Sequence, residues 1–67
     1  MNLFVSRLNE LIKNSGKQQN EICKDLKIYK QKFSRWKLGN TEPNFDELIL
    51  LAKYFNVSTD YLLGLED

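Results

Sequence analysis

The sequence predicts an all-α protein that folds as a compact five-helix bundle. Apolar residues recur at the spacing of a 3.6-residue helix in successive stretches, and residues that cap or end helices stand between those stretches. The chain has 67 residues, enough for one small core, and it contains no repeats, low-complexity segments or linkers. We therefore expect a single domain over residues 1–67.

The first helix is predicted over Leu3–Ser15. Asn2 is suited to cap its N-terminus, and Gly16 can adopt the left-handed backbone conformation that ends it. Its apolar residues have the i, i+4, i+7, i+8 pattern of a helix buried on one face: Phe4, Leu8, Leu11 and Ile12.

Two short helices on either side of a tight turn are predicted between residues 18 and 38. The first spans Gln19–Leu26, beginning near Gln18 and stopping near Lys27, and the second spans about Lys30–Leu38. Their expected buried residues are, in order, Ile22, Cys23, Leu26, Phe33 and Trp36. Because Phe33 and Trp36 lie three residues apart on the apolar side, we expect them in the core rather than stacked on a base.

Two more helices are predicted after a polar loop that runs from Asn40 to Pro43. Asn44 and Glu47 have the spacing of a capping box at the start of the fourth helix, Asn56 stops that helix, and Ser58 caps the last one. The expected apolar stripe of the fourth helix is Phe45, Leu48, Ile49, Ala52 and Phe55, with Leu51 at its edge. In the last helix, Tyr61, Leu62 and Leu65 are expected to close the core.

The polar side of the third predicted helix carries the residues that indicate function. Lys30, Gln31, Ser34 and Arg35 stand at i, i+1, i+4 and i+5, so they share one face. A helix fits the major groove of DNA, and the base edges there expose acceptors for long donor side chains. This face therefore predicts binding to double-stranded DNA.

The same region resembles the Cro/lambda-repressor type of helix-turn-helix, also called the XRE family. The matching positions are Gln19, Cys23, Ile28 and Ser34-Arg35-Trp36, followed by Gly39, Glu42-Pro43, Leu51-Ala52-Lys53, Val57-Ser58 and Asp60-Tyr61-Leu62-Leu63-Gly64. The resemblance covers roughly residues 6–64. It implies a lambda-repressor-like domain in which the second and third helices form the helix-turn-helix motif, at about residues 18–38.

The resemblance implies base contacts by Lys30 and Gln31, and Arg35 continues the same face. Arg or Lys suits guanine O6 and N7, and Gln suits adenine N6 and N7. We therefore predict a half-site with a G opposite Arg35 or Lys30 and an A near Gln31. The alternative interpretation is that these side chains are only solvated.

Phosphate contacts are predicted around this face. Gln19 stands in the first turn of its helix, where the positive end of the helix dipole favours a phosphate. For Tyr29 we prefer packing beneath Phe33, with contact to a thymine methyl or a phosphate as the alternative. The full predicted set is Gln18, Gln19, Tyr29, Lys32, Ser34, Asn40 and Thr41. Lys37 stays outside this set, and for both Lys32 and Lys37 the alternative is a side chain that is only solvated.

Five residues depart from the pattern of the family: Lys17, Gln18, Lys27, Tyr29 and Leu38. Lys27 stands where the family generally has Gly, and a left-handed backbone there would cost about 1–2 kcal/mol. Gln18 and Tyr29 replace the usual capping residues, and a missing cap costs about 0.5–2 kcal/mol.

Charge is divided between the two halves of the chain, although the net charge is only +1. From Lys13 to Lys37 eight basic residues stand against two acidic ones, a balance of +6. From Glu42 to Asp67 six acidic residues stand against Lys53, a balance of −5. Such a molecule can approach a polyanion in one orientation, with the predicted DNA-reading helix toward it.

Composition argues against several classes of function. The chain has no His and no cluster of metal ligands or buried paired acids, so we expect no metal, no cofactor and no enzyme. No apolar run approaches the ~20 residues of a membrane span, and we expect no membrane partner. Cys23 is the only cysteine, which fits a reducing compartment and a cytoplasmic protein.

The predicted function is that of a transcriptional regulator, a repressor of phage, mobile-element or bacterial type that binds DNA as a homodimer. One such helix covers few base pairs, so we expect two copies on a near-palindromic operator with half-sites ~34 Å apart. The expected dimer contacts are Leu50, Leu63 and Leu65. Two alternatives remain open. The chain could be a protein-interaction module, such as an antitoxin or anti-repressor target, that binds a protein partner through its last helices, or the DNA-binding fragment of a longer protein.

Overall fold

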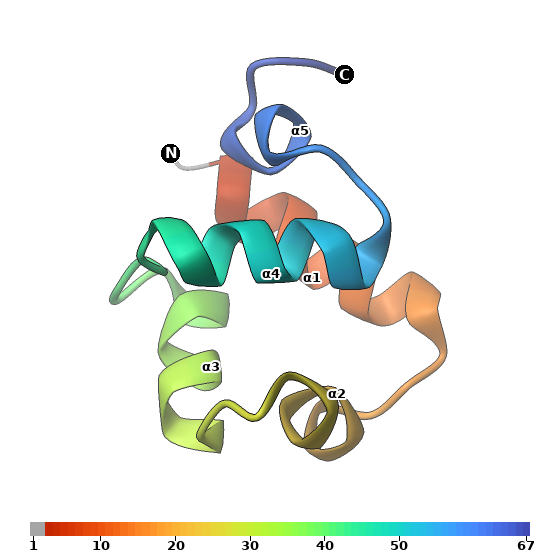
Figure 1. The fold of residues 1–67 in the computed structure, drawn as a ribbon, viewed down its shortest axis with the longest axis vertical. Helices are drawn as coiled ribbons and strands as arrows, with labels where there is room; N and C mark the ends of the chain where they lie inside the picture. The colour runs from red at the N-terminus through yellow and green to blue at the C-terminus, as the bar shows by residue number, and fades with distance from the viewer. Residues whose placement is uncertain (1–2) are drawn as a thin grey trace.

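The computed structural model describes residues 3–67, and the predicted cap Asn2 lies outside them. The helices in this part of the chain are α1 (Leu3–Ser15), α2 (Gln19–Leu26), α3 (Lys30–Leu38), α4 (Phe45–Phe55) and α5 (Thr59–Leu63). Residues 3–67 contain no strand, so the predicted five-helix, all-α fold is confirmed. In Figure 1, α4 crosses the middle of the molecule, with α5 on one side and α2 and α3 on the other.

Each helix contributes side chains to one core. α1 packs against α3 and α5, and α2 packs against α3 and α4. Six of the predicted core residues are at most 1% exposed: Leu8, Ile22, Phe33, Trp36, Leu51 and Leu62. Leu11, Ile12 and Phe55 pack against this core while only partly buried. The helical spacing of the apolar residues therefore predicted the central residues of the core correctly.

The core prediction is wrong at four positions. Tyr61 is only partly buried and is not among the residues packed against the core, and the other three are exposed. Phe45 is 85% exposed, Leu65 is 73% exposed and Ile49 is 45% exposed, whereas Leu51, predicted at the edge of its stripe, is fully buried. Phe45 is the first residue of α4, and Leu65 follows the end of α5, so both lie beyond the turns that contact the core. The buried face of α4 is therefore turned toward Leu51 and Ala52 and away from Ile49.

The caps of α4 and α5 form as predicted. The Asn44 side chain accepts a bond from the Glu47 backbone N–H, and the Glu47 carboxylate accepts one from the Asn44 N–H, both at 2.8 Å. At α5, the Ser58 hydroxyl accepts a bond from the Tyr61 N–H at 2.9 Å. Gln18 and Tyr29 make no side-chain cap bond to α2 and α3, as expected for residues that replace caps.

Left-handed backbone ends the helices on both sides of the turn. Lys27 closes α2 with φ 58° and ψ 45°, and its N–H bonds to carbonyls in the last turn. Gly39 closes α3 with φ 80°, and a Cβ there would lie 3.2 Å from the Val5 side chain. Lys27 therefore adopts the left-handed backbone for which a cost was predicted.

A polar cluster of Lys17, Asp25 and Tyr54 joins α2 to α4. The Tyr54 hydroxyl donates to Asp25 Oδ2 at 2.6 Å, while Lys17 Nζ lies 3.1 Å from that hydroxyl and 3.5 Å from Oδ2. The hydrogen bond from Tyr54, with help from Lys17, lowers the pKa of Asp25 below its usual 3.8. The cluster thus favours the ionised carboxylate in the folded state.

Candidate functional site

Lys30, Gln31 and Arg35 stand together on the solvent side of α3, and we call these three residues the reading face. All three are exposed. Neither ion pair among residues 3–67 involves them. Their long donor side chains are consequently available to a ligand. Lys30 and Gln31 are the first two residues of the helix, and Arg35 lies one turn further along.

The opposite side of α3 anchors the helix in the core. Phe33 is 0% exposed and Trp36 is 1% exposed, with their ring centroids 5.9 Å apart in an edge-to-face arrangement. This confirms the prediction that both rings are core, and it leaves neither one available to stack on a base. Buried aromatic residues on one side fix the direction in which the reading face points.

Gln19 lies at the junction of α2 and α3, where Ser34 and Lys37 fix its side chain. Its Nε2 donates to the Ser34 hydroxyl and its Oε1 accepts from Lys37 Nζ, both at 2.8 Å. We call these residues the Gln19 cluster. The structure thus brings together two predicted phosphate residues and adds Lys37, which sequence reasoning had left less certain. The sequence signal for Lys37 was only its charge, because a contact between two helices cannot be read from spacing within one of them.

Lys32 has a different partner from the one predicted for it. Its ammonium forms an ion pair with the Glu47 carboxylate, which also belongs to the capping box of α4. Burial disfavours ionised Glu47, but the bonds from Lys32 and the Asn44 backbone outweigh it, so the pKa of Glu47 lies below its usual 4.5. Because Lys32 is half exposed, its ammonium would have to share or exchange this partner in order to contact a phosphate.

The remaining predicted phosphate residues, Gln18, Tyr29, Asn40 and Thr41, are all exposed. Tyr29 is 82% exposed, so the preferred interpretation that it packs beneath Phe33 is wrong. Its backbone is extended, at φ −64° and ψ 141°, which places it before α3 rather than on that helix. The i, i+4 spacing that suggested the contact therefore does not apply. The Tyr29 side chain stands beside the reading face in sequence and is open to solvent.

Cys23 is buried at the contact between α2 and the core, with 3% of its surface exposed. Burial raises the pKa of its thiol, and the nearby charges of Lys30 and Lys37 only partly oppose this. A buried neutral thiol reacts poorly, so Cys23 has the packing role predicted for it.

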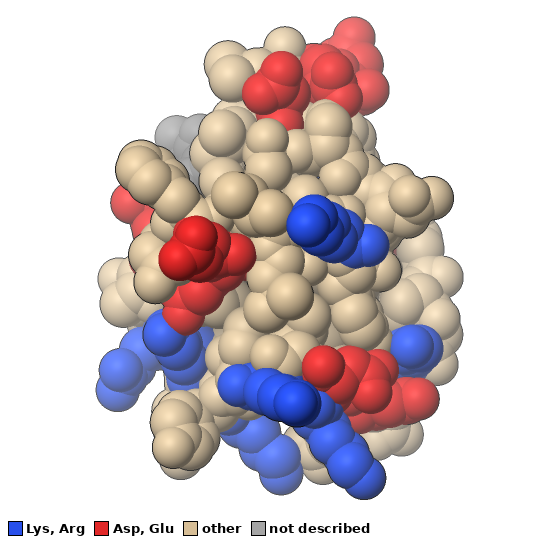
Figure 2. All heavy atoms as spheres, in the orientation of Figure 1, with Lys and Arg blue, Asp and Glu red and all other residues tan. Residues whose placement is uncertain are grey.

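The charges of the two halves of the sequence are largely separated in space, apart from contacts such as the pair of Lys32 with Glu47. Figure 2 shows most of the Lys and Arg side chains of this face near α2 and α3, and Asp and Glu side chains at the end that holds α5. The reading face belongs to the basic end. A polyanion would be drawn to that end and repelled from the other.

Large apolar side chains on α4, on α5 and just after α5 are open to solvent. The three residues predicted to form dimer contacts belong to them: Leu50 is 41% exposed, Leu63 is 52% exposed and Leu65 is 73% exposed. Their exposure leaves them accessible to another molecule, which is a necessary condition for the predicted role.

Metal-binding groups and membrane-spanning helices were both looked for in the described part of the chain. Within residues 3–67, no three His, Cys, Asp or Glu side chains stand close enough to hold a metal ion. In the same span, no helix is both long enough and apolar enough to cross a membrane.

Comparison with known proteins gives matches over nearly the whole chain. The sequence profile of a helix-turn-helix domain family matches residues 5–67. The HTH-type transcriptional regulator ImmR of Bacillus subtilis (strain 168) is 36% identical over 61 residues, which are 91% of this chain and 48% of that protein. An SPbeta prophage-derived uncharacterized HTH-type transcriptional regulator of the same organism, YonR, is 31% identical over 91% of this chain and 56% of its own length. The chain thus spans about half the length of these curated relatives.

Solved structures show the same fold. The solution structure of the SOS-response transcriptional repressor LexA from Eubacterium rectale is similar with a TM-score of 0.87 and 35% identity, over 97% of this chain and 67% of that one. The crystal structure of a transcriptional regulator from Listeria innocua is similar with a TM-score of 0.84 and 31% identity, over 96% of this chain and 60% of that one.

Proposed function

The chain belongs to the helix-turn-helix domain family, and from that premise we propose that it is a sequence-specific double-stranded DNA-binding transcriptional regulator. The observation that carries the proposal is the reading face, three exposed long donors on a helix whose other side is buried in the core. In this proposal α3 enters the major groove. Arg35 or Lys30 pairs with guanine, and Gln31 pairs with adenine.

Phosphate contacts position the reading face over the bases in this proposal. The Gln19 cluster brings the positive charge of Lys37 and two polar side chains next to the first turn of α2, where the positive end of the helix dipole favours an anion. Gln18, Tyr29, Asn40 and Thr41 are exposed and complete the proposed set. Lys32 belongs to it only when its ammonium exchanges Glu47 for a phosphate.

We propose that the protein represses transcription, because occupying an operator excludes other proteins without any further activity. Two similar proteins support this proposal. One relative is a prophage-derived transcriptional regulator, and one structural neighbour is a transcriptional repressor. The compartment would be the cytoplasm, where DNA and a reduced Cys23 are both expected.

We further propose that residues 1–67 form one domain that binds as a homodimer on a near-palindromic operator. One helix of nine residues reads few base pairs, and two copies double the site. Half-sites would lie ~34 Å apart, one turn of DNA. The exposed Leu50, Leu63 and Leu65 are the proposed dimer contacts.

The test is selection of bound duplexes from a randomised DNA library by the purified protein at near-physiological salt. An enriched palindrome with G and A in each half-site is the expected result. A single half-site would refute the dimer while keeping the DNA-binding proposal. If no sequence were enriched over the starting library, sequence-specific binding would be wrong.

A further inference from the structure

A shallow hollow opens on the surface between α2 and α3, at the turn that joins them (Figure 1), and we call it the basic hollow. Its volume is about 440 Å³. Three lysines belong to its lining: Lys24 from α2, Lys27 from the turn and Lys30 from the start of α3. Asn20 and Tyr29 are the other polar residues of the lining. The hollow thus gathers positive charge from two helices and the turn between them.

The three lysines of the basic hollow are not paired with acidic side chains in the described part of the chain. Both ion pairs among residues 3–67, Lys17 with Asp25 and Lys32 with Glu47, leave them out. Of the described residues that line the hollow, none is acidic. All three lysines are exposed, and like charges gathered around one hollow repel each other. An anion bound there would relieve that repulsion.

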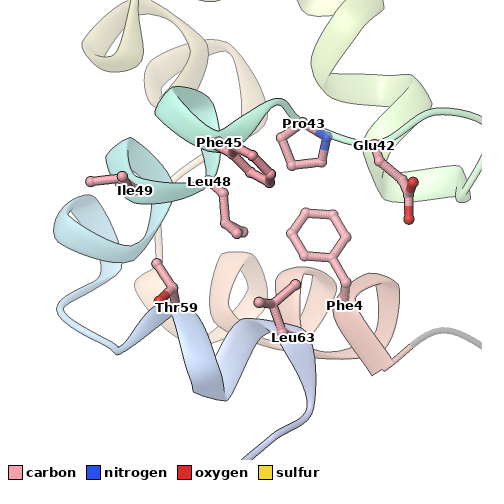
Figure 3. Close-up of a pocket in the computed structure, with 8 residues that line it drawn as sticks. All are labelled: Phe4, Glu42, Pro43, Phe45, Leu48, Ile49, Thr59 and Leu63. Carbon is pink, nitrogen blue, oxygen red and sulfur yellow. The ribbon is translucent and has the colours of Figure 1, made fainter.

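A second hollow, between α1, α4 and α5, has a different character. Figure 3 shows the apolar side chains of Phe4, Leu48 and Leu63 pointing into it. Among the described residues of its lining, Glu42 alone is charged, so this hollow offers no positive charge to an anion. The basic hollow lies instead at the end of the molecule near which Figure 2 shows most Lys and Arg side chains of that face. A phosphate is therefore drawn to the basic hollow.

The position of Lys30 indicates which phosphate the basic hollow would meet. Lys30 belongs both to the hollow and to the reading face, so the hollow borders the surface proposed to face the bases. Phosphates follow the bases along each strand, and a duplex read by Lys30 therefore brings phosphates to this border. A small phosphate compound fits less well, because sites for small molecules are deeper and mostly apolar.

Lys27 gives a second reason to assign an anion to the basic hollow. Its backbone is left-handed, with φ 58°, a conformation in which glycine has no Cβ to clash. Residues held in such conformations are concentrated at functional sites. The Lys27 ammonium forms no ion pair with another residue of 3–67, so its charge is available to an external anion.

We propose that the basic hollow binds one backbone phosphate of the operator through the ammonium groups of Lys24 and Lys27 and the hydroxyl of Tyr29. This inference rests on the proposed DNA-binding function and adds a contact to it. The Gln19 cluster holds a phosphate at the start of α2, and the basic hollow holds another at the end of α2. Two phosphate contacts, one at each end of this helix, fix the register of α3 on the duplex.

The test compares the wild-type protein with the double variant Lys24→Met, Lys27→Met, which loses two charges and keeps much of its side-chain volume. Fluorescence anisotropy at several salt concentrations measures binding to the selected operator. We expect about five-fold weaker binding, and a slope of log K against log salt that is smaller in magnitude by about 1. Lys13→Met with Lys53→Met is the matched control, since both are exposed and outside the hollow, and it should weaken binding less than about two-fold.

Neutralised phosphates locate the contact on the DNA. Each operator phosphate is replaced in turn by an uncharged methylphosphonate, and each duplex is titrated with the wild-type protein and the double variant. One position in each half-site is expected to weaken the wild-type protein and not the double variant, because both changes remove the same contact. If every position weakened the two proteins equally, the basic hollow would hold no phosphate and the proposal would be overturned.

Lys27→Gly separates binding from folding. It removes the charge and also the left-handed strain, so a protein at least as stable as the wild type should bind the operator about three-fold more weakly. Binding as tight as that of the wild type would overturn the role of Lys27.

Selection from the randomised library separates this inference from the proposed function. The double variant should select the same motif as the wild-type protein, because a phosphate contact carries no base preference. A changed motif would make these lysines base contacts and overturn the inference. A wild-type motif together with unchanged affinity in the double variant would refute the basic hollow alone. If the wild-type protein selected no motif, the proposed function would fail and this inference with it.

Discussion

Lys27 and Asn56 place different side chains on the same left-handed backbone. Lys27 has φ 58° and ψ 45° and ends α2, and Asn56 has φ 57° and ψ 46° and ends α4. Asn adopts this conformation more readily than most residues, because its short polar side chain can hydrogen-bond locally. In Lys nothing offsets the steric clash of Cβ with the following carbonyl oxygen. The pair therefore offers a controlled measure of backbone strain within one molecule.

We expect Lys27→Gly to raise the free energy of unfolding by roughly 1 kcal/mol, because relief of strain exceeds the added entropy of the unfolded chain. Asn56→Gly should change it by less than about 0.5 kcal/mol. Urea denaturation followed by circular dichroism measures both. A loss of stability in Lys27→Gly as large as that in a buried-core variant would show that the Lys27 side chain does more than close the turn.

In the candidate site, the sequence predicted which residues share one helix face but not which residues of different helices touch. The reading face could be predicted because Lys30, Gln31 and Arg35 lie on one helix, and spacing along one helix determines which side chains share a face. The structure confirms their exposure and leaves their base contacts as predictions. The bond from Gln19 to Lys37 and the pair of Lys32 with Glu47 could not be predicted, because each joins two helices whose relative position is set by packing.

The helices themselves could be predicted almost in full. Their boundaries follow from capping and stop residues such as Asn44, Asn56 and Ser58, whose effect on the backbone is local. The exposure of Phe45 and Leu65 could not be predicted in the same way. A periodic pattern gives the direction of an apolar face, but it does not show which of its residues extend past the neighbouring helices.

The Lys32–Glu47 pair connects α3 to the first turn of α4. Its coupling can be measured with a double-mutant cycle that uses Lys32→Met and Glu47→Gln, in which both single variants keep much of their side-chain volume. We expect a coupling free energy of about 0.5–1 kcal/mol, the value of a partly exposed pair. It should shrink as salt is added. A coupling near zero at low salt would show that the contact contributes nothing to holding α3 against α4.

The whole molecule should lose stability in acid. Asp25 and Glu47 both have a lower pKa in the folded state than the usual 3.8 and 4.5. Each therefore binds its proton less readily when folded. Its contribution is complete above the usual pKa and is lost as the pH falls through the lower, folded value. The urea midpoint should accordingly be steady between about pH 7 and 5 and fall below about pH 4.

Tyr54→Phe tests the source of this acid sensitivity. It removes the hydroxyl that is the main cause of the low pKa of Asp25, so the fall in urea midpoint between neutral and acidic pH should be smaller than in the wild-type protein. Glu10→Gln is the control, since it removes an exposed carboxyl that has no place in either cluster. An unchanged fall in Tyr54→Phe would mean that the cluster of Lys17, Asp25 and Tyr54 does not carry the effect.

In the function proposed above, the division of charge across the molecule directs its basic end, and with it α3, toward DNA. The most direct test of that account is to repeat the selection from a randomised library with Arg35→Ala beside the wild-type protein. We predict that one base pair in each half-site loses its preference for G, at a cost of about 1–3 kcal/mol, while preferences at the other positions persist. If Arg35→Ala weakened binding to every sequence alike and left the selected motif unchanged, Arg35 would be a phosphate contact, and base reading by this face would be contradicted.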